Sequence, residues 1–221
     1  MIAAEKVDAL LNRLFIEPLL GFGYPVNSMK LLQRIEKFIK QDDEKNLAFD
    51  MDFIGVQNYT REMVSHTTFM PFMQAKIIRA NKRNVITTLM NWEVYPESVY
   101  NVLKKYGSYK NMPALMVTEN GAAFTDVLCK GEVHDPKRIQ YLRDTISQVL
   151  RAKQEGVNVT GYFIWTFLDN FEWAEGYYPR FGLVYVDFAS QKRTVKSSGK
   201  WYAAFLKNVT MEAVGNVSKW G

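Results

Sequence analysis

The feature of this sequence that most constrains its fold is the alternation of short apolar runs with a long segment of helical periodicity. In residues 135–156 the apolar side chains recur at spacings of three and four, with a proline near the start and a glycine at the end, and this pattern predicts one amphipathic helix. Apolar runs at 114–118 and 159–167 flank that helix, and another at 51–58 precedes it. Short apolar strands separated by helices are typical of a parallel sheet that helices cover.

The remaining segments are expected to cover or connect these strands. Helices are predicted from the apolar stripe between Val7 and Phe15, over 28–39, over 96–107 and over 197–206, and an extended segment that turns near Ala189 is predicted over 180–190. Residues 60–95 lack a regular period and are expected to be a functional loop region. The pattern does not distinguish a closed barrel from an open doubly wound sheet, although no glycine-rich phosphate-binding motif supports a nucleotide-binding fold.

The composition excludes several classes of protein. The chain has 221 residues, of which 48% are apolar, and 28 basic against 23 acidic side chains give a net charge of +5; this balance is typical of a globular domain and excludes a disordered chain. The densest basic stretch, from Lys76 to Arg83, stands outside any nucleic-acid-binding motif and is interpreted as a solvated face. No nucleic-acid partner is expected.

Metal and membrane sites are also not expected. Cys129 is the single cysteine, and His66 and His134 are the two histidines, so neither an intramolecular disulfide nor a His- or Cys-based metal site is predicted. The sequence contains no apolar run of membrane-spanning length, and its first residues do not resemble a signal peptide. These features predict a cytoplasmic protein.

Chemically active side chains follow two of the predicted strands. Glu119 comes directly after the apolar run 114–118, where a parallel-sheet enzyme holds its catalytic groups rigidly. Taken alone, the Thr-Glu-Asn-Gly sequence is also consistent with a structural turn.

A second cluster follows the strand predicted over 159–167. It contains Trp165, Glu172, Trp173 and Phe181. Indole faces stack on the apolar faces of sugar rings, and a carboxylate accepts hydrogen bonds from sugar hydroxyls. The cluster therefore favours a carbohydrate site, and the alternative is a set of core tryptophans beside one surface glutamate.

Several long segments resemble a known family. They are DFIGVQNYT, NWEVYP, LMVTENG, YFIWTFLDNFEWAEGYYPRFGLVYVDF and KRTVKSSGKWY. Together they are similar to the C-terminal region of family 1 glycoside hydrolases, the β-glucosidase and 6-phospho-β-glycosidase family. The resemblance implies an α/β fold in which residues 1–207 form part of a (β/α)8 TIM barrel with its last three strands. Residues 208–221 are expected to form a frayed tail.

The same resemblance implies roles for individual residues. Glu119 matches the nucleophile that forms a glycosyl-enzyme, and Tyr59 matches the tyrosine that orients it. The implied substrate-binding residues are Trp165, Glu172, Trp173, Phe181, Gln57 and Trp92. Among them Glu172 would hold the glycone hydroxyls, whereas 6-phospho members of the family tend to replace this glutamate, so an unphosphorylated β-glycoside or oligosaccharide is the expected substrate. The chemistry requires no cofactor.

One departure from the family pattern limits this interpretation. Retaining glycosidases use two carboxylates about 5 to 5.5 Å apart, and the family's acid/base glutamate lies in an Asn-Glu-Pro motif that is absent here. The one Glu-Pro pair, Glu17 and Pro18, ends a predicted helix and does not match. We therefore expect a retaining β-glycosidase that is inactive alone and needs a complementary N-terminal half-barrel chain or self-association.

Two other functions remain open from the sequence. A non-catalytic sugar-binding or assembly fragment would use the same tryptophans and leave Glu119 without a catalytic role. A basic nucleic-acid binder would associate with DNA in a steeply salt-dependent manner, and it lacks a supporting motif.

Overall fold

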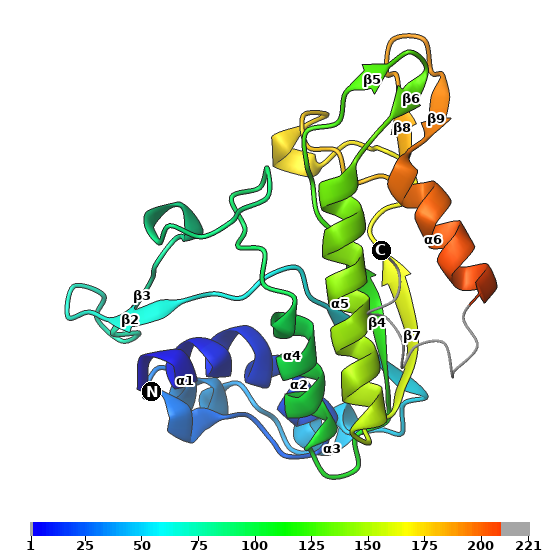
Figure 1. Ribbon diagram of the computed structural model, residues 1–221. Coiled ribbons are helices and arrows are strands. Elements are labelled where there is room, and N and C mark those ends of the chain that lie inside the picture. Colours follow the sequence, from blue (N-terminus) through cyan, green and yellow to red (C-terminus); the bar gives the residue numbers. More distant parts are fainter. Residues whose placement is uncertain (1, 209–221) are drawn as a thin grey trace. The chain divides into compact units, whose positions relative to one another are not determined.

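The computed structural model describes residues 2–208 (Figure 1). The chain divides into two compact units. The first unit comprises Met1–Asp52, Glu62–Asn84 and Lys110–Met112, and the second comprises Phe53–Arg61, Val85–Tyr109 and Pro113–Gly221. The tail predicted to be frayed lies, from residue 209 onward, outside the described residues.

The first unit begins with the predicted helix. This helix runs without a break through α1 (Ile2–Asp8), the π-helical turn η1 (Ala9–Arg13) and α2 (Leu14–Leu19). Shorter elements follow: η2 (Val26–Ser28), η3 (Leu32–Lys37), α3 (Asp43–Leu47), β2 (Val64–His66), β3 (Ala75–Ile77) and η4 (Ala80–Lys82). Ala9, Met29 and Leu32 form its small apolar core. The segment expected to be irregular thus contains an antiparallel hairpin, β2 with β3.

The α-helix predicted over 28–39 is wrong. The segment instead forms the 3-10 helix η3, with bonds such as Leu32 N to Met29 O at 2.9 Å. Leu32 is buried, but Phe38 is 80% exposed. The packing of this segment on the small core of the first unit ends at Ile35, and the exposed Phe38 contributes no burial that would extend an α-helix to residue 39.

The second unit contains the predicted parallel sheet. Its strands are β1 (Phe53–Gln57), β4 (Ala114–Asn120) and β7 (Val159–Ile164), in the order β1-β4-β7. Its principal helices are α4 (Glu97–Gly107), α5 (Pro136–Gln154) and α6 (Ser197–Asn208). Figure 1 shows α4 beside α5, and α5 running along β7. Parallel strands with helices alternating along the chain confirm the α/β prediction.

The two faces of this sheet differ sharply. Val56, Val117 and Tyr162 lie in one row of the register, on the face that packs against the helices. On the other face Phe53 is 48% exposed and Phe163 is 55% exposed. The strand predicted over 51–58 is confirmed as β1, but the burial that its apolar run implied is wrong for most of its residues, because β1 is an edge strand with one uncovered face.

Three further elements surround the ends of β4 and β7. They are the hairpin of β5 (Leu128–Cys129) with β6 (Glu132–Val133), the 3-10 turn η5 (Trp173–Glu175), and the hairpin of β8 (Val184–Val186) with β9 (Arg193–Val195). The β8–β9 hairpin agrees with the turn predicted near Ala189. Across residues 2–208, none of the helices combines the length and the apolar character required to cross a membrane.

Candidate active site

The carboxylate of Glu119 lies where β1 and β4 end side by side. Gln57 pairs with Glu119 in the register, and the Asn58 amide donates to the Glu119 carbonyl at 3.1 Å. This pairing brings the next residue of the first segment, Tyr59, to the carboxylate, and the Tyr59 hydroxyl donates to Oε2 of Glu119 at 2.8 Å. Two residues that are sixty positions apart in the sequence therefore form one hydrogen-bonded pair.

The environment of Tyr59 keeps its hydroxyl protonated. Burial raises the pKa of this phenol first, and the hydrogen bond to Glu119 and the negative charges of Glu119 and Glu172 raise it further. A protonated hydroxyl next to a carboxylate can only donate to it. Because Oε2 accepts this bond, Oε1 of Glu119 remains for other interactions.

Trp165 and Glu172 form a second pair in the loop that follows β7. The Trp165 indole donates from Nε1 to Oε1 of Glu172 at 3.1 Å. The Trp165 amide donates to the carbonyl of Asn120 at 2.8 Å, and a Cβ at Gly121 would collide with the Trp165 carbonyl oxygen. The loop after β7 is thus held directly against the end of β4, and Gly121 permits this close approach.

The aromatic rings of Tyr59, Trp92 and Phe181 pack against one another. The ring centroids of Tyr59 and Trp92 are 5.2 Å apart, and those of Tyr59 and Phe181 are 6.2 Å apart in an edge-to-face arrangement. Phe181 is only 2% exposed, so it supports the other two rings from the interior. Such pairs contribute about 0.5 to 1.5 kcal/mol beyond the area they bury.

The predicted site residues therefore fall into three groups. Glu119, Tyr59, Trp92 and Phe181 are in mutual contact through Tyr59, and Trp165 and Glu172 form a neighbouring pair whose carboxylate influences Tyr59. Trp173 and Gln57 stand apart as exposed side chains, Trp173 being 82% exposed.

Asn120 is a central residue of the site to which the sequence assigned no role. Its side chain is 1% exposed, donates to the carbonyl of Asn58 at 2.6 Å and to the Tyr141 hydroxyl at 3.0 Å, and accepts from the Tyr162 hydroxyl at 2.7 Å. Tyr141 in turn donates to the carbonyl of Tyr59 at 3.2 Å. These bonds fix the backbone on both sides of the Tyr59–Glu119 pair. The signal available in the sequence was the asparagine directly after Glu119.

Beneath the site lies a set of buried charges, here called the charge cluster. Its members are Asp126, Asp135, Asp169, Arg138, Arg180 and Lys196. Five of the six side chains are at most 1% exposed, and the remaining one, Arg180, is 18% exposed. The three acids balance the three bases, as burial requires, because an unpaired charge in the interior is very unfavourable.

Asp135 is the member of the charge cluster that lies at the start of α5. The helix α5 begins as predicted, with Asp135 at its N-cap, but the carboxylate makes no capping bond to that helix. Instead it accepts bonds from Arg138 and from the amide and hydroxyl of Ser198, at 2.8 and 2.5 Å for the latter two. Asp135 therefore joins α5 to the start of α6.

Lys196 is the most enclosed member of the charge cluster. Burial and the positive charge of Arg138 lower the pKa of its ammonium group, while the charges of Asp126 and Asp169 and the hydrogen bond to Asp126 oppose this shift. Nothing in the sequence distinguishes Lys196 from the many solvated lysines, because its partners are brought to it only by the folded chain.

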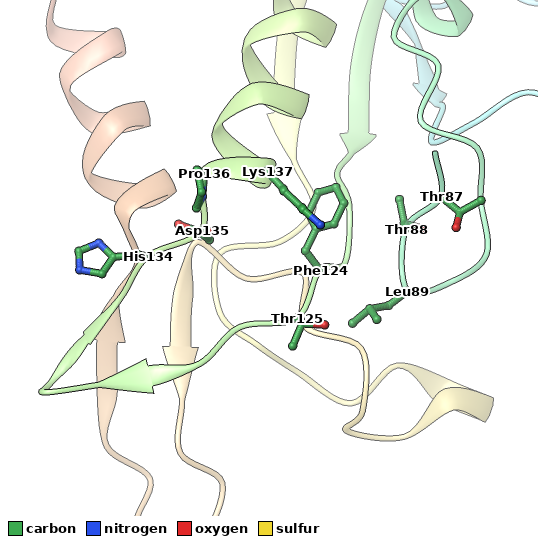
Figure 2. Close-up of a pocket in the computed structure, with 9 residues that line it drawn as sticks. All are labelled: Thr87, Thr88, Leu89, Phe124, Thr125, His134, Asp135, Pro136 and Lys137. Atoms are coloured by element: carbon green, nitrogen blue, oxygen red, sulfur yellow. The ribbon is translucent and has the colours of Figure 1, made fainter. Parts of the chain in front are cut away.

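A separate cavity of about 420 Å³ lies beside the start of α5 (Figure 2). It is lined by Thr87, Thr88, Leu89, Phe124, Thr125, His134, Asp135, Pro136 and Lys137. None of the predicted site residues lines it. Within residues 2–208, no group of three or more histidine, cysteine or acidic side chains is arranged to hold a metal ion.

The sequence as a whole matches a known class of enzymes. A sequence profile of glycosyl hydrolase family 1 matches residues 1–211. The chain therefore belongs to glycosyl hydrolase family 1, and the family resemblance drawn from its motifs is confirmed.

The chain is similar to individual members of that family over nearly all of its length. It is 43% identical over 200 residues to Beta-glucosidase A of Thermotoga maritima, an alignment that covers 90% of this chain and 44% of that protein. An enzyme from Alicyclobacillus herbarius aligns with a TM-score of 0.86 at 39% identity, covering 94% of this chain and 47% of the other. The Thermotoga maritima β-glucosidase in complex with castanospermine aligns with a TM-score of 0.84 at 40% identity, over 93% and 46% of the two chains. This chain thus spans less than half the length of these relatives.

Proposed function

We propose that this chain supplies the nucleophile and part of the sugar-binding wall of a retaining β-glycosidase, acting on β-glucosides or related sugars. The hydrogen bond from Tyr59 to Glu119 carries this proposal. A nucleophilic carboxylate must be held rigidly with one oxygen free, and this bond together with the Asn120 contacts provides that arrangement. The β-glucosidases among its relatives support the substrate class.

In the proposed reaction Oε1 of Glu119 attacks the anomeric carbon of the sugar. The glycosidic bond breaks, a general acid protonates the departing oxygen, and the sugar becomes an ester of Glu119. Water then attacks the same carbon, gives its proton to the former acid, and releases the sugar and the carboxylate. Tyr59 holds Oε2 throughout the attack and so directs Oε1 toward the sugar.

Trp165 and Glu172 would bind the glycone. The indole bond to Oε1 of Glu172 leaves Oε2 of that carboxylate available to accept from sugar hydroxyls, and the indole face offers a stacking surface. Trp92 would line the aglycone entrance. The exposed side chains of Trp173 and Gln57 would complete the sugar-binding wall when sugar is bound. Phe181 would support the rings of Tyr59 and Trp92 from the interior.

We further propose that the general acid comes from protein outside these 221 residues. The described strands β1, β4 and β7 would be the last three of a (β/α)8 barrel, and the uncovered face that bears Phe163 would meet the others. A complementary half-barrel chain, or self-association, would then be required for turnover. The isolated chain is expected to be inactive because it lacks one of the two carboxylates that the mechanism needs.

The test is reconstitution of hydrolysis. This chain is combined with a chain carrying the family's remaining strands, and release of an aryl alcohol from an aryl β-glucoside is measured. Restored activity is expected, and Glu119→Gln should lower kcat by about four orders of magnitude or more. The matched control is Glu175→Gln, an exposed glutamate in η5, which should leave kcat unchanged.

The alternative function, a non-catalytic sugar-binding fragment, predicts a different outcome. Sugar would quench or enhance tryptophan fluorescence in a saturable manner, but no hydrolysis would appear after the second half is added. Hydrolysis that survives Glu119→Gln would exclude Glu119 as the nucleophile.

A further inference from the structure

Two loops that leave the sheet carry or adjoin the candidate site. The loop after β4 follows Glu119 and contains Asp126, and the loop after β7 carries Trp165, Glu172 and Asp169. The side chains of Asp126 and Asp169 are completely buried. A single ammonium group, that of Lys196, binds both: Nζ lies 2.5 Å from Oδ2 of Asp126 and 2.7 Å from Oδ1 of Asp169.

On the side of the second loop, Asp169 fixes the chain that returns beneath the site. Its carboxylate accepts from the Gly182 amide at 2.9 Å and from the Val186 amide at 3.4 Å, and it pairs with Arg180 at 2.7 Å. The segment held in this way contains Phe181, which packs against Tyr59 and Trp92. A shift of Asp169 would therefore be transmitted to the rings around the nucleophile.

On the side of the first loop, Asp126 is joined to the start of α5. Its two oxygens accept from Arg138 at 3.1 and 3.0 Å, and Arg138 also donates to the carbonyl of Ala122 at 3.3 Å. The same guanidinium reaches the carbonyl of Arg180 at 2.7 Å. Asp126 is therefore fixed independently of Lys196, as Asp169 is by Arg180.

Lys196 itself has no freedom to move away. It is 0% exposed, and its amide donates to the carbonyl of Leu183 at 2.9 Å. Arg138 is shared between Asp126 and Asp135, so Lys196 supplies the third positive charge that balances the charge cluster. It also links the two loops directly, because one ammonium group binds a carboxylate from each of them.

We propose that Lys196 is a positioning residue whose ammonium group sets the spacing between the loop that follows Glu119 and the loop that carries Trp165 and Glu172. The inference rests on the proposed function, since it assigns to these loops the nucleophile and the glycone-binding groups. Lys196 does not touch substrate; it acts through Asp126 and Asp169. A misplacement of about 1 Å in such a site can lower the rate about 100-fold.

The test separates this linking role from charge balance. Lys196→Met removes both the link and one positive charge, whereas Lys196→Met combined with Asp126→Asn removes the link but leaves the charge cluster neutral. Lys200→Met is the matched control, because Lys200 lies about one turn further along the chain, in α6, with a side chain that is 62% exposed. Two quantities are measured for each variant: the indole ¹H–¹⁵N signal of Trp165 in this chain, assigned with Trp165→Phe, and kcat/KM in the reconstituted enzyme.

If Lys196 links the two loops, the indole signal of Trp165 should shift in both Lys196 variants and should not shift in Lys200→Met. The double variant should regain the urea midpoint lost by Lys196→Met, yet kcat/KM should remain about 100-fold below the parent value. If the double variant regains the Trp165 signal and kcat/KM together with stability, Lys196 only balances charge and the proposal is wrong.

Two further outcomes are decided by the same measurements. If neither Lys196 variant folds, Asp126→Asn alone serves as the test, because it weakens one arm of the link while leaving Lys196 in place, and an unshifted Trp165 signal would then overturn the proposal. If the parent reconstituted enzyme shows no hydrolysis, the proposed function fails, while the Trp165 signal still reports whether Lys196 positions the loop.

Discussion

The polar ends of the strands and the uncovered face of the same sheet are built in opposite ways. At the ends of β4 and β7, carboxylates, guanidinium groups and hydroxyls are buried and paired with one another, and Asn120 and Asp169 are 1% and 4% exposed. On the uncovered face the exposed side chains are apolar, as Phe53 and Phe163 show. Both regions thus depart from the usual preference for apolar side chains inside and polar ones outside: polar groups are buried at the strand ends, and apolar rings are exposed on the uncovered face.

This contrast shows that the two regions are stabilised in different ways. The charge cluster satisfies its own members and needs no outside partner. The uncovered face, by contrast, leaves the rings of Phe53 and Phe163 exposed, and under the proposed function it would meet the rest of the barrel. The charge cluster can therefore be tested on the chain alone, whereas the proposed catalysis is tested on the reconstituted enzyme.

The largest effect expected in this comparison comes from removing a charge of the polar region. Arg138→Met leaves the carboxylates of Asp126 and Asp135 with one uncompensated buried charge, and the free energy of unfolding should fall by about 3 to 5 kcal/mol. Urea denaturation of the parent chain and of Arg138→Met measures this loss of stability. The adjacent, exposed Lys137 is the control, and Lys137→Met should change stability by less than about 0.5 kcal/mol. Equal losses in the two variants would show that the charge cluster is not a paired interior.

The next largest effect is a pH dependence of stability at alkaline pH. Burial raises the pKa of Tyr141 to about 12, whereas a tyrosine in the unfolded chain ionises near pH 10, as a rough model value. Above that pH the folded state holds a proton that the unfolded state has lost, so stability falls as pH rises from about 10 to 12, by about 1.4 kcal/mol per pH unit for this residue. Below this window the contribution is fully present.

Urea midpoints at pH 9, 10 and 11 measure this slope. Tyr141→Phe should reduce the slope by the amount expected for one proton, while Tyr178→Phe, at a tyrosine that is 72% exposed, should leave it unaltered. A slope that Tyr141→Phe does not change would contradict the assignment of a buried, protonated phenol beneath the site.

The smallest effect is expected on the uncovered face. Phe163→Ala should change the free energy of unfolding of the isolated chain by less than about 0.5 kcal/mol, because the ring is largely in solvent. Leu115→Ala, at a buried position of β4 with 1% exposure, should cost about 2 to 5 kcal/mol. If Phe163→Ala and Leu115→Ala lower the free energy of unfolding by similar amounts, Phe163 is not on an uncovered face of the sheet.

The sequence predicted the scaffold well because strand and helix periods are local signals. The runs at 114–118 and 159–167 and the long helix between them were placed to within a few residues. The segment 28–39 failed because its apolar spacing resembles a helix, while burial, which decides whether a helix forms there, depends on distant parts of the chain.

The candidate site was predicted in part and for a similar reason. Glu119, Trp165 and Glu172 stand out because their residue types are concentrated at strand ends. Asn120 and Lys196 did not, since their importance comes from partners 21 to 70 positions away. A buried lysine and a solvated lysine are identical in sequence, and only the folded chain distinguishes them.

The most direct test of the central claim is to trap the glycosyl-enzyme. The reconstituted enzyme is treated with an activated 2-deoxy-2-fluoro-β-glucoside, and the digested protein is analysed by mass spectrometry. We predict that the fluorosugar is found on the peptide that contains Glu119 and is absent from Glu119→Gln. A label on any other residue of an active enzyme, or the same label on the Glu119→Gln protein, would contradict it.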